Sequence, residues 1–314
     1  MAATKLADVI VPEVFNPYVV ERTAEKTALI QSGVIQPVSD IQIGEGTTIN
    51  LPFFQDLSGA DNLWVDTVDI SLNKIDTEKD VAVVLTREKA FGASDLSASL
   101  SGSDPMAAIG SLIGGYWARR IQVTLINTLN GAMAAFNDNT LDISGLGGGA
   151  DTIDGEAFVD ATQKLGDQGD ALTDIAMHSA VEASLRVLDL IDFIPDSEGK
   201  LTIRSFQGRR VYVDDNMPVT SGVYTSYLFG QGAVSFVDEM QPNANEAYRH
   251  PDKNGGTDAL YTRRKFVMHP RGVAWTGTAA AATPTNAELA TSGNWARRWE
   301  AKNIRIVRFI HNVA

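Results

Sequence analysis

The chain has 314 residues, of which 44% are hydrophobic and 21% are charged, and these proportions are those of a folded globular protein. It has no cysteine, which excludes disulfides, thiolate nucleophiles and cysteine-based zinc sites. The formal net charge is −13, with 12 basic and 30 acidic residues in positions 1–200 but 14 basic and 9 acidic residues in positions 201–314. A tight nucleic-acid binder needs a dense basic face, which the first 200 residues lack. The asymmetry suits copies of one chain that meet acidic face to basic face, although acidic residues can equally serve solubility alone.

The first 90 residues are expected to reach beyond the body of the subunit. Residues 1–40 begin with an extended segment, VIVPEVF, and continue into a short helix that ends near Gly33. Residues 41–90 contain two alternating stretches, IQIGEGTTINLPFF and VDISLNKIDTEKDVAVVLTREKA, which predict a long two-stranded hairpin. An isolated hairpin is marginal in water, so we expect it to bury its apolar side chains on another subunit. The alternative is that both strands join the main sheet.

Residues 104–136 predict one long helix. Asp104 is a good N-cap, and Pro105 occupies the first helical position, where its missing N–H is not needed. Apolar residues recur at helical spacing, namely Met106, Ile109, Ile113, Tyr116, Trp117, Ile121, Leu125, Leu129, Met133 and Phe136. Four glycines weaken the helix but permit a bend or the close approach of another backbone: Gly110, Gly114, Gly115 and Gly131. We interpret this helix as the spine of the subunit.

The remainder predicts a compact α/β module followed by late strands. Helices are expected over GEAFVDATQKLGD, with Asp154 as its cap, and over AVEASLRVLDLIDF, which Pro195 stops. Strands are expected over TDIAMHS, GRRVYVDDNMPV and YTSYLFGQGAVSFV. Residues 241–259 predict a polar loop, and RRKFVMHPRGVAW and the apolar NIRIVRFIHNV predict the last strands. So apolar a strand at the end of the chain is expected to insert into a sheet.

The sequence predicts no catalytic, cofactor-binding or metal-binding residues. The run GLGGGA at 145–150 has the spacing of a dinucleotide fingerprint, but a helix cannot start before about Asp154, so no helix N-terminus would meet the phosphate. We interpret the run as a linker. No membrane partner is expected either, because no stretch reaches the 18 or so apolar residues of a spanning helix and the N-terminus lacks the apolar core of a secretory signal.

The histidines and acidic clusters also favour structural roles. His178, His250, His269 and His311 lie far apart in the sequence, and His178 is expected to be a satisfied core histidine in a buried strand. DKNGGTD at 252–258 approaches the spacing of a calcium loop, but Thr257 replaces the required glycine and Arg263 the required glutamate, so a solvated turn is expected. Asp214-Asp215 is likewise expected to form a turn.

The order of these elements resembles the major capsid (coat) proteins of tailed bacteriophages, whose shell fold is shared with encapsulins and herpesvirus capsid proteins. YTSYLFGQGAV (224–234), KFVMHPRGVAW (265–275) and WEAKNIRIVRFIHNV (299–313) are similar to the late strands of such proteins. The resemblance implies an α+β phage major-capsid fold with five parts. These are an N-terminal arm (1–40), an extended β-hairpin loop (41–90), a peripheral domain (91–151 and 241–300) with the spine helix (104–136), and an α/β axial domain (152–240 and 301–314).

The resemblance also implies a structural protein rather than an enzyme. Many copies would self-assemble as hexamers and pentamers into the icosahedral shell that encloses the double-stranded DNA genome, without sequence-specific binding. Further expected partners are scaffolding, portal and decoration proteins, with assembly in the host bacterial cytoplasm and a final location in the virion. Some members crosslink a lysine of the extended loop to an asparagine. Lys74 and Lys79 lie in that region, but nothing identifies an asparagine partner, so no bond is predicted. The alternatives are an encapsulin-like compartment and a nucleotide-dependent enzyme that uses the 145–150 loop.

Charge indicates candidate contact residues between subunits. The basic candidates are Arg297, Arg298, Lys302 and Arg305, and the acidic candidates in the extended loop are Asp61, Asp66, Asp69, Asp76 and Glu78. We expect reversal of Arg297 and Arg298 to lower the yield of shells while leaving the melting temperature of the monomer nearly unchanged. The alternative is that both sets are simply solvated faces.

Overall fold

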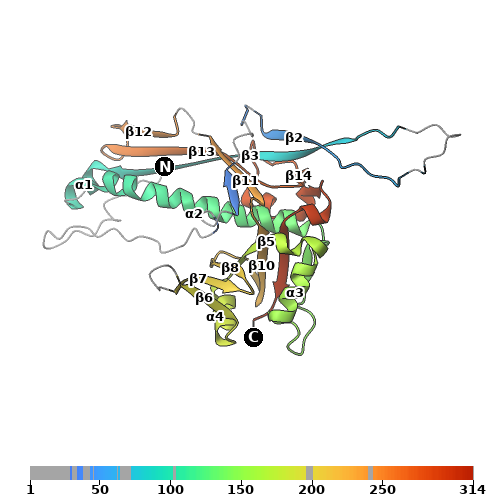
Figure 1. Cartoon of the computed structure of the whole chain (residues 1–314). Helices are drawn as coiled ribbons and strands as arrows, with labels where there is room; N and C mark the ends of the chain where they lie inside the picture. The colour runs from blue at the N-terminus through green and yellow to red at the C-terminus, as the bar shows by residue number, and fades with distance from the viewer. Residues whose placement is uncertain are drawn as a thin grey trace.

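Two sheets and one long helix organise the subunit, here described from a computed structural model (Figure 1). The structure describes residues 29, 34–37, 43–44, 46–61, 63, 72–101, 104–195, 201–239 and 243–313. The predicted N-terminal arm therefore lies outside the described residues, except for Leu29 and residues 34–37.

A long sheet, with six strands among the described residues, forms the upper layer of the molecule in Figure 1. Its path runs β1 (Ile35–Pro37), β11 (Val234–Glu239), β13 (Thr257–Pro270), β3 (Thr77–Ser94) and β2 (Thr48–Phe54), and β12 (Asn245–His250) also pairs with β13. β3 pairs with β13 through residues 84–94 and with β2 through residues 77–83. One half of β3 therefore belongs to the main sheet and the other half to a two-stranded hairpin, so each of the two expectations for residues 41–90 is met in part.

The predicted spine helix is α2 (Pro105–Ala134), which follows the short helix α1 (Asp95–Ser101). The Asp104 side chain accepts hydrogen bonds from the backbone N–H groups of Met106 and Ala107 at 2.9 and 3.1 Å, which confirms the cap. All buried residues of α2 lie from Trp117 onward, whereas residues 105–116 are partly buried or exposed. The described chain thus buries the C-terminal half of the predicted apolar stripe more completely than the N-terminal half.

Gly131 lets α2 approach α5 (Asn286–Leu289) closely. A Cβ atom on Gly131 would lie 1.9 Å from the carbonyl oxygen of Leu289 and 2.9 Å from Nε1 of Trp295. Gly110 and Gly114, in contrast, are exposed and would place a Cβ in open space. The close approach that the glycines permit is therefore used at Gly131.

The second sheet has eight strands among the described residues and lies below α2 in Figure 1. Its path runs β4 (Thr140–Asp142), β16 (Ile306–His311), β10 (Val223–Gly230), β5 (Leu172–Met177), β8 (Arg209–Val213), β7 (Leu201–Phe206) and β6 (Ile191–Pro195), and β9 (Val219–Thr220) pairs with β10. The final apolar strand is confirmed, since β16 lies between β4 and β10. The elements that complete the fold are α3 (Gly155–Gln163), η2 (Gly166–Ala171), α4 (Ser179–Val187), β14 (Val273–Trp275), η3 (Ser292–Asn294), β15 (Trp295–Arg297) and η4 (Ala301–Asn303).

The helix expected to run as far as Pro195 is shorter than predicted. α4 ends at Val187, and residues 191–195 form β6, which pairs with β7. Asp189 adopts φ +57° in the left-handed region, and the N–H of Leu190 donates to the carbonyl of Leu185, which closes the helix. The prediction was wrong because Ile191 and Phe193 alternate as strand residues once this turn has ended the helix.

The polar loop expected at 241–259 is also wrong in part, because residues 245–250 form β12. Five of the six β12 side chains are exposed, so no apolar alternation marks the strand. Backbone pairing with β13 and a turn with positive φ at Asn254, Gly255 and Gly256 create it. The Asn-Gly-Gly run was the available signal for this hairpin.

The main hydrophobic core joins both sheets through α2. Leu125, Leu129 and Met133 of α2 share this core with residues from both layers, namely Val83, Leu85, Phe266 and Met268 of the long sheet and Tyr227, Phe229 and Ile306 of the second. A separate core lies within the second sheet and its helices, around Phe158, Leu185 and Phe206. β4 and β11 also exchange layers relative to the expected segments, since residues 140–142 pair in the second sheet and residues 234–239 in the long one.

We expect Gly131→Ala to lower the free energy of unfolding of the unassembled subunit by at least about 2 kcal/mol, because the added methyl group overlaps the α5 backbone. Gly110→Ala is the matched control and should gain up to about 1 kcal/mol from helix propensity alone. Urea denaturation of both variants measures the two effects. Equal stability changes in the two variants would contradict a role for Gly131 in helix packing.

Candidate functional site

The two motifs that were candidates for ligand binding, the 145–150 run and the 252–258 segment, lie in turns and at the start of a strand. The 145–150 run forms exposed turns with positive φ at Gly147, Gly148 and Gly149, and α3 begins only at Gly155. Asp252 and Asn254 lie in the turn between β12 and β13, while Asp258 is paired with Arg249. Among the described residues, no group of three or more His, Cys, Asp or Glu side chains could hold a metal ion. Within that same part of the chain, no helix has the length and hydropathy needed to span a membrane.

His178 differs from its expected setting, whereas His311 has the structural role that was expected. His178 is not a core residue of a strand; it is half buried and caps α4, with its Nδ1 accepting the N–H of Ala180 at 3.0 Å. His311 and Ser226 are fully buried, and Nε2 of His311 lies 2.9 Å from the Ser226 hydroxyl. The His311 Nδ1–H donates to the carbonyl of Asn312, so Nε2 accepts from the serine. This pair has the geometry of a nucleophile and its base, but burial keeps substrates away, and it serves to join β10 to β16.

The hairpin formed by β2 and the first half of β3 exposes a run of large apolar side chains. Phe54, Leu57, Leu63 and Leu72 are each at least 70% exposed, and Ile75 is half exposed. In Figure 1 the described part of this hairpin extends past the rest of the chain. Leaving so many apolar side chains in water is unfavourable by about 25 cal/mol per Å², so this surface has the character of an interface.

A groove of about 670 Å³ lies at the root of the same hairpin. Its apolar lining comes from Phe53, Phe54 and Trp299, and the Phe53 and Trp299 rings meet edge to face at 6.0 Å. Four cations, Arg271, Arg298, Lys302 and Arg305, and two acids, Asp56 and Glu300, also line it. The groove is therefore both aromatic and net positive in a chain whose net charge is −13.

The structure brings three of the four predicted basic residues to this groove but pairs most of them within the chain. Arg298 lies 3.5 Å from Glu78, and Lys302 lies 2.9 Å from Asp167. Arg297 lies outside the groove lining and pairs with Asp138. Arg305 is exposed and has no carboxylate partner among the described residues. The expectation that Arg298 and Glu78 lie on opposite faces is wrong, because they contact one another in one subunit.

The acidic candidates of the hairpin divide into three groups. Asp61 is exposed, whereas Asp66 and Asp69 lie outside the described residues. Asp76 forms an exposed pair with Lys74 at 2.8 Å, and Lys79 is exposed.

The groove cation that sequence reasoning missed is Arg271, whose Nε donates to the Ser235 hydroxyl at 2.9 Å. Its charge lies only two positions before the β14 strand, and no sequence pattern marks it.

A buried carboxylate connects the hairpin to the groove. Asp80 of β3 is 4% exposed, and one carboxylate oxygen accepts the N–H of Gly272 at 3.1 Å, while the other has no hydrogen-bond partner among the described residues. The Gly272 carbonyl in turn accepts the N–H groups of Arg298 and Trp299. Burial raises the pKa of Asp80 to about 6; Glu78 adds to the shift, whereas the Gly272 hydrogen bond and the charge of Arg298 oppose it. Segments around positions 80, 272 and 298 therefore converge at the hairpin root.

Two histidines are buried in the neutral form. His269 is 1% exposed, and neither of its ring nitrogens has a hydrogen-bond partner in the part of the chain that the structure describes. Burial lowers the pKa of His269 to about 4, and the nearby charge of Arg271 adds to the shift. Burial also lowers the pKa of His311 to about 4, against the hydrogen bond to the Asn312 carbonyl, which favours the protonated ring.

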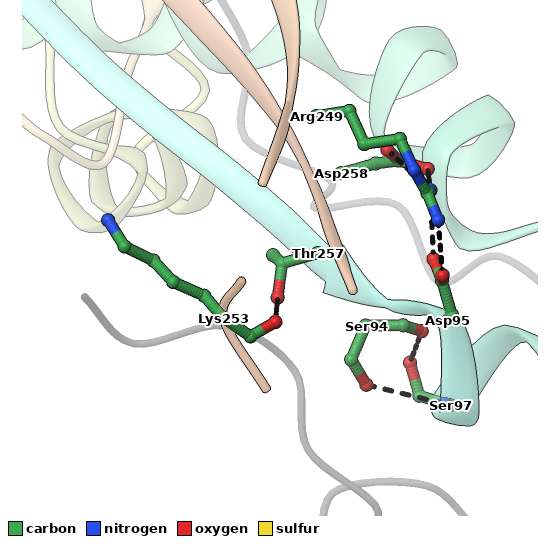
Figure 2. A network of polar contacts seen from close by, with 7 residues as sticks. All are labelled: Ser94, Asp95, Ser97, Arg249, Lys253, Thr257 and Asp258. Carbon is green, nitrogen blue, oxygen red and sulfur yellow. Dashed lines mark hydrogen bonds and ion pairs between the residues drawn. The ribbon is translucent and has the colours of Figure 1, made fainter. Parts of the chain in front are cut away.

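At the other end of the long sheet, Arg249 holds α1 against the β12–β13 turn (Figure 2). Its guanidinium lies between Asp95, at 3.1 Å, and Asp258, also at 3.1 Å. The hydrogen bonds from Arg249 lower the pKa of Asp95. Ser97 donates to the carbonyl of Ser94, and the Asp95 N–H donates to the carbonyl of Gly256. Figure 2 shows the Lys253 side chain directed away from this network.

Comparison with known proteins identifies relatives over the whole chain. The model of the Gp13-like family, described as major capsid protein 13-like, matches residues 20–303. The major capsid protein of Bacillus phage SPP1 is 43% identical over 326 aligned residues, which cover 100% of this chain and 99% of the relative.

Solved structures of low sequence identity share the fold. The capsid protein of cyanophage Pam1 has a TM-score of 0.62 at 14% identity, with 96% of each chain covered. That of Ralstonia phage GP4 has a TM-score of 0.61 at 10% identity, covering 100% of this chain and 98% of the other. The SrpI encapsulin from Synechococcus elongatus has a TM-score of 0.58 at 9% identity, covering 96% and 92%. These structures confirm the predicted phage capsid fold.

We expect the unassembled subunit to lose stability as the pH falls from about 6.5 to 4. Over this interval the unfolded chain protonates His269 and His311 and the folded chain does not, whereas Asp80 takes up its proton earlier in the folded state and opposes the loss. The two histidine protons destabilise the fold by more than the one Asp80 proton stabilises it, so the free energy of unfolding falls. His269→Leu should reduce the loss by about 3 kcal/mol, the equivalent of its pKa shift. Urea titrations at pH 7 and pH 4 measure this, and equal pH dependence in the variant and the parent chain would contradict it.

Proposed function

The chain belongs to the Gp13-like family of major capsid proteins, and on this premise we propose how its copies join into a shell. It is the major capsid protein of a tailed phage and forms the capsid shell, a structural role; the observation that carries this is the 43% identity to a phage major capsid protein over the full length of both chains. The encapsulin shares only the fold, at 9% identity. The nucleotide-dependent enzyme has no support from the 145–150 loop, whose glycines lie in exposed turns.

The finer picture of the assembly is our proposal. Copies of the chain form hexamers and pentamers of an icosahedral shell, with scaffolding, portal and decoration proteins as further partners and the host bacterial cytoplasm as the place of assembly. The shell encloses double-stranded DNA by confinement, without sequence-specific binding and without catalysis. The net charge of −13 supports confinement, because a chain of this charge repels the phosphate backbone overall.

We assign the two layers to two domains. The peripheral domain contains α2 and the long sheet: residues 91–151 and 241–300 supply α2, β12 and β13, β11 joins from the segment 152–240, and β1, β2 and most of β3 join from the first 90 residues. The axial domain contains the second sheet, mainly from residues 152–240 and 301–314, and β4 joins it from the first segment. The strand pairings of β4 and β11 support this division.

The hairpin is the element that we propose to contact a neighbouring subunit. Residues 55–76 contain five aspartates and one lysine, and four of the exposed apolar side chains named above lie among them. The groove at the hairpin root offers the complementary chemistry, with three aromatic rings and four cations against two acids. Phe54 and Asp56 belong to both surfaces, but the rest of the hairpin extends away from its own groove, so it can reach such a groove only in another copy (Figure 1). Such a contact is head-to-tail and generates rings when the rotation closes.

Deletion of residues 59–69 tests this role of the hairpin. The deleted stretch lies beyond the paired residues of β2 and β3, so the subunit should keep its circular dichroism spectrum and its melting temperature. Shells should be absent or rare in electron micrographs when the variant is expressed with its scaffolding protein. Loss of the fold itself in the variant would show that the segment belongs to the core of its own subunit.

Charge reversal at Arg305 tests the groove. We expect Arg305→Glu to lower the yield of shells several-fold while changing the free energy of unfolding by less than about 0.5 kcal/mol, because its exposed charge has no partner within the described residues. Lys253→Glu, at an exposed turn remote from the groove, is the matched control. Arg297 and Arg298 are less suitable than the sequence indicated, because each is paired internally. Normal shells from the Arg305 variant at low and moderate salt would remove the electrostatic part of the contact.

A further inference from the structure

A small cavity between α2 and the long sheet is lined by two arginines that come from different elements. It measures about 120 Å³, and Arg87 of β3, Arg120 of α2 and the rings of Tyr116, Trp117 and Phe266 line it. Arg87 faces α2 because side chains alternate along a strand, and Val83 and Leu85, at the same parity, lie in the core with α2. Two cations thus meet at a cavity of the size of a few water molecules.

Arg87 is half buried, yet its hydrogen bonds go to neutral groups. Its Nη1 donates to the carbonyl of Thr86 and the hydroxyl of Thr283, both at 3.2 Å. Its Nη2 donates to the carbonyl of Pro284 at 2.6 Å and to the amide oxygen of Asn286 at 3.5 Å. These contacts fix the guanidinium but leave its charge uncompensated, and an uncompensated buried charge is costly.

Arg120 adds a second charge of the same sign. It is exposed and has no hydrogen bond or ion pair through its guanidinium among the described residues. Burial lowers the pKa of Arg87, and the charge of Arg120 lowers it further. The acid nearest in sequence, Glu88, also borders the cavity, but strand alternation directs it to the opposite face of the sheet, where it acts on Arg263.

We propose that Arg87 and Arg120 form a seat for a carboxylate side chain from a second copy of this chain. A carboxylate matches guanidinium groups in shape and charge, and it would relieve the repulsion between the two arginines. A second copy is the source that the molecule favours, because its 39 acidic residues outnumber its 26 basic ones and because the neighbours of a shell subunit are other copies. The identity of the partner, a second copy of this chain, rests on the proposed function as a shell subunit. A DNA phosphate is the competing occupant that the experiments distinguish.

Acetate serves as the first probe of the Arg87–Arg120 seat. The unassembled subunit should melt at a higher temperature in sodium acetate than in sodium chloride of equal ionic strength at pH 7, and Arg120→Gln should abolish the difference. Lys253→Gln, an exposed lysine elsewhere, should retain it. The same acetate effect in the parent chain and in the Arg120 variant would overturn the seat.

Carbodiimide crosslinking identifies the occupant in assembled shells. R120K places an amine at the seat that reacts only with a carboxylate in contact, and the parent chain with Arg120 is the blank. We expect a new crosslink between two copies, in DNA-filled and in empty shells alike. A crosslink confined to one chain, no crosslink, or a crosslink found only in empty shells because DNA occupies the seat, would each overturn the proposal. Shells that form without the crosslink would leave the proposed function standing, whereas failure of the parent chain to form shells would count against that function.

Discussion

The burial of the C-terminal half of α2 between two sheets is the constraint on which the rest of the subunit depends. Leu125, Leu129 and Met133 contact residues of both layers, so one hydrophobic core joins segments more than 100 residues apart in the sequence. Gly131 brings α5 against the same stretch, and the Gln122 side chain donates to buried Asp214 of the second layer. A rigid connection between the layers follows, because close-packed cores transmit displacement rather than absorb it.

The same constraint explains which surfaces remain unfinished. The N-terminal half of α2 is less completely buried than the C-terminal half, and the hairpin exposes Phe54, Leu57, Leu63 and Leu72. A chain that folds alone normally covers such residues, whereas a subunit of a larger assembly leaves them for a neighbour. The exposed hairpin and the groove at its root lie at one end of the long sheet, and the Arg249 pairing that holds α1 lies at the other (Figures 1 and 2). A long element with distinct ends suits head-to-tail contacts.

Electrostatics adds direction to these contacts more than stability. Most cations near the groove already have partners within the chain, such as Arg298 with Glu78, and exposed pairs of this kind contribute little. Within the described residues, Arg271 and Arg305 at the groove and the Arg87–Arg120 pair beside α2 have no carboxylate partner. Such groups favour an acidic neighbour and disfavour a basic one, which gives specificity to the association of identical chains.

The sequence by itself determined the elements whose signals are local. Asp104, Pro105 and the 3.6-residue periodicity predicted α2, and the cap at Asp154 predicted α3, because capping and periodicity depend on neighbouring residues only. The order of elements also indicated the capsid fold. Only the tertiary structure decided that α4 ends at Val187, that residues 245–250 pair as a strand, and that β3 divides between sheet and hairpin. It also decided which cations are free, since Arg298 and Glu78 lie 220 positions apart and no local pattern can reveal that they meet.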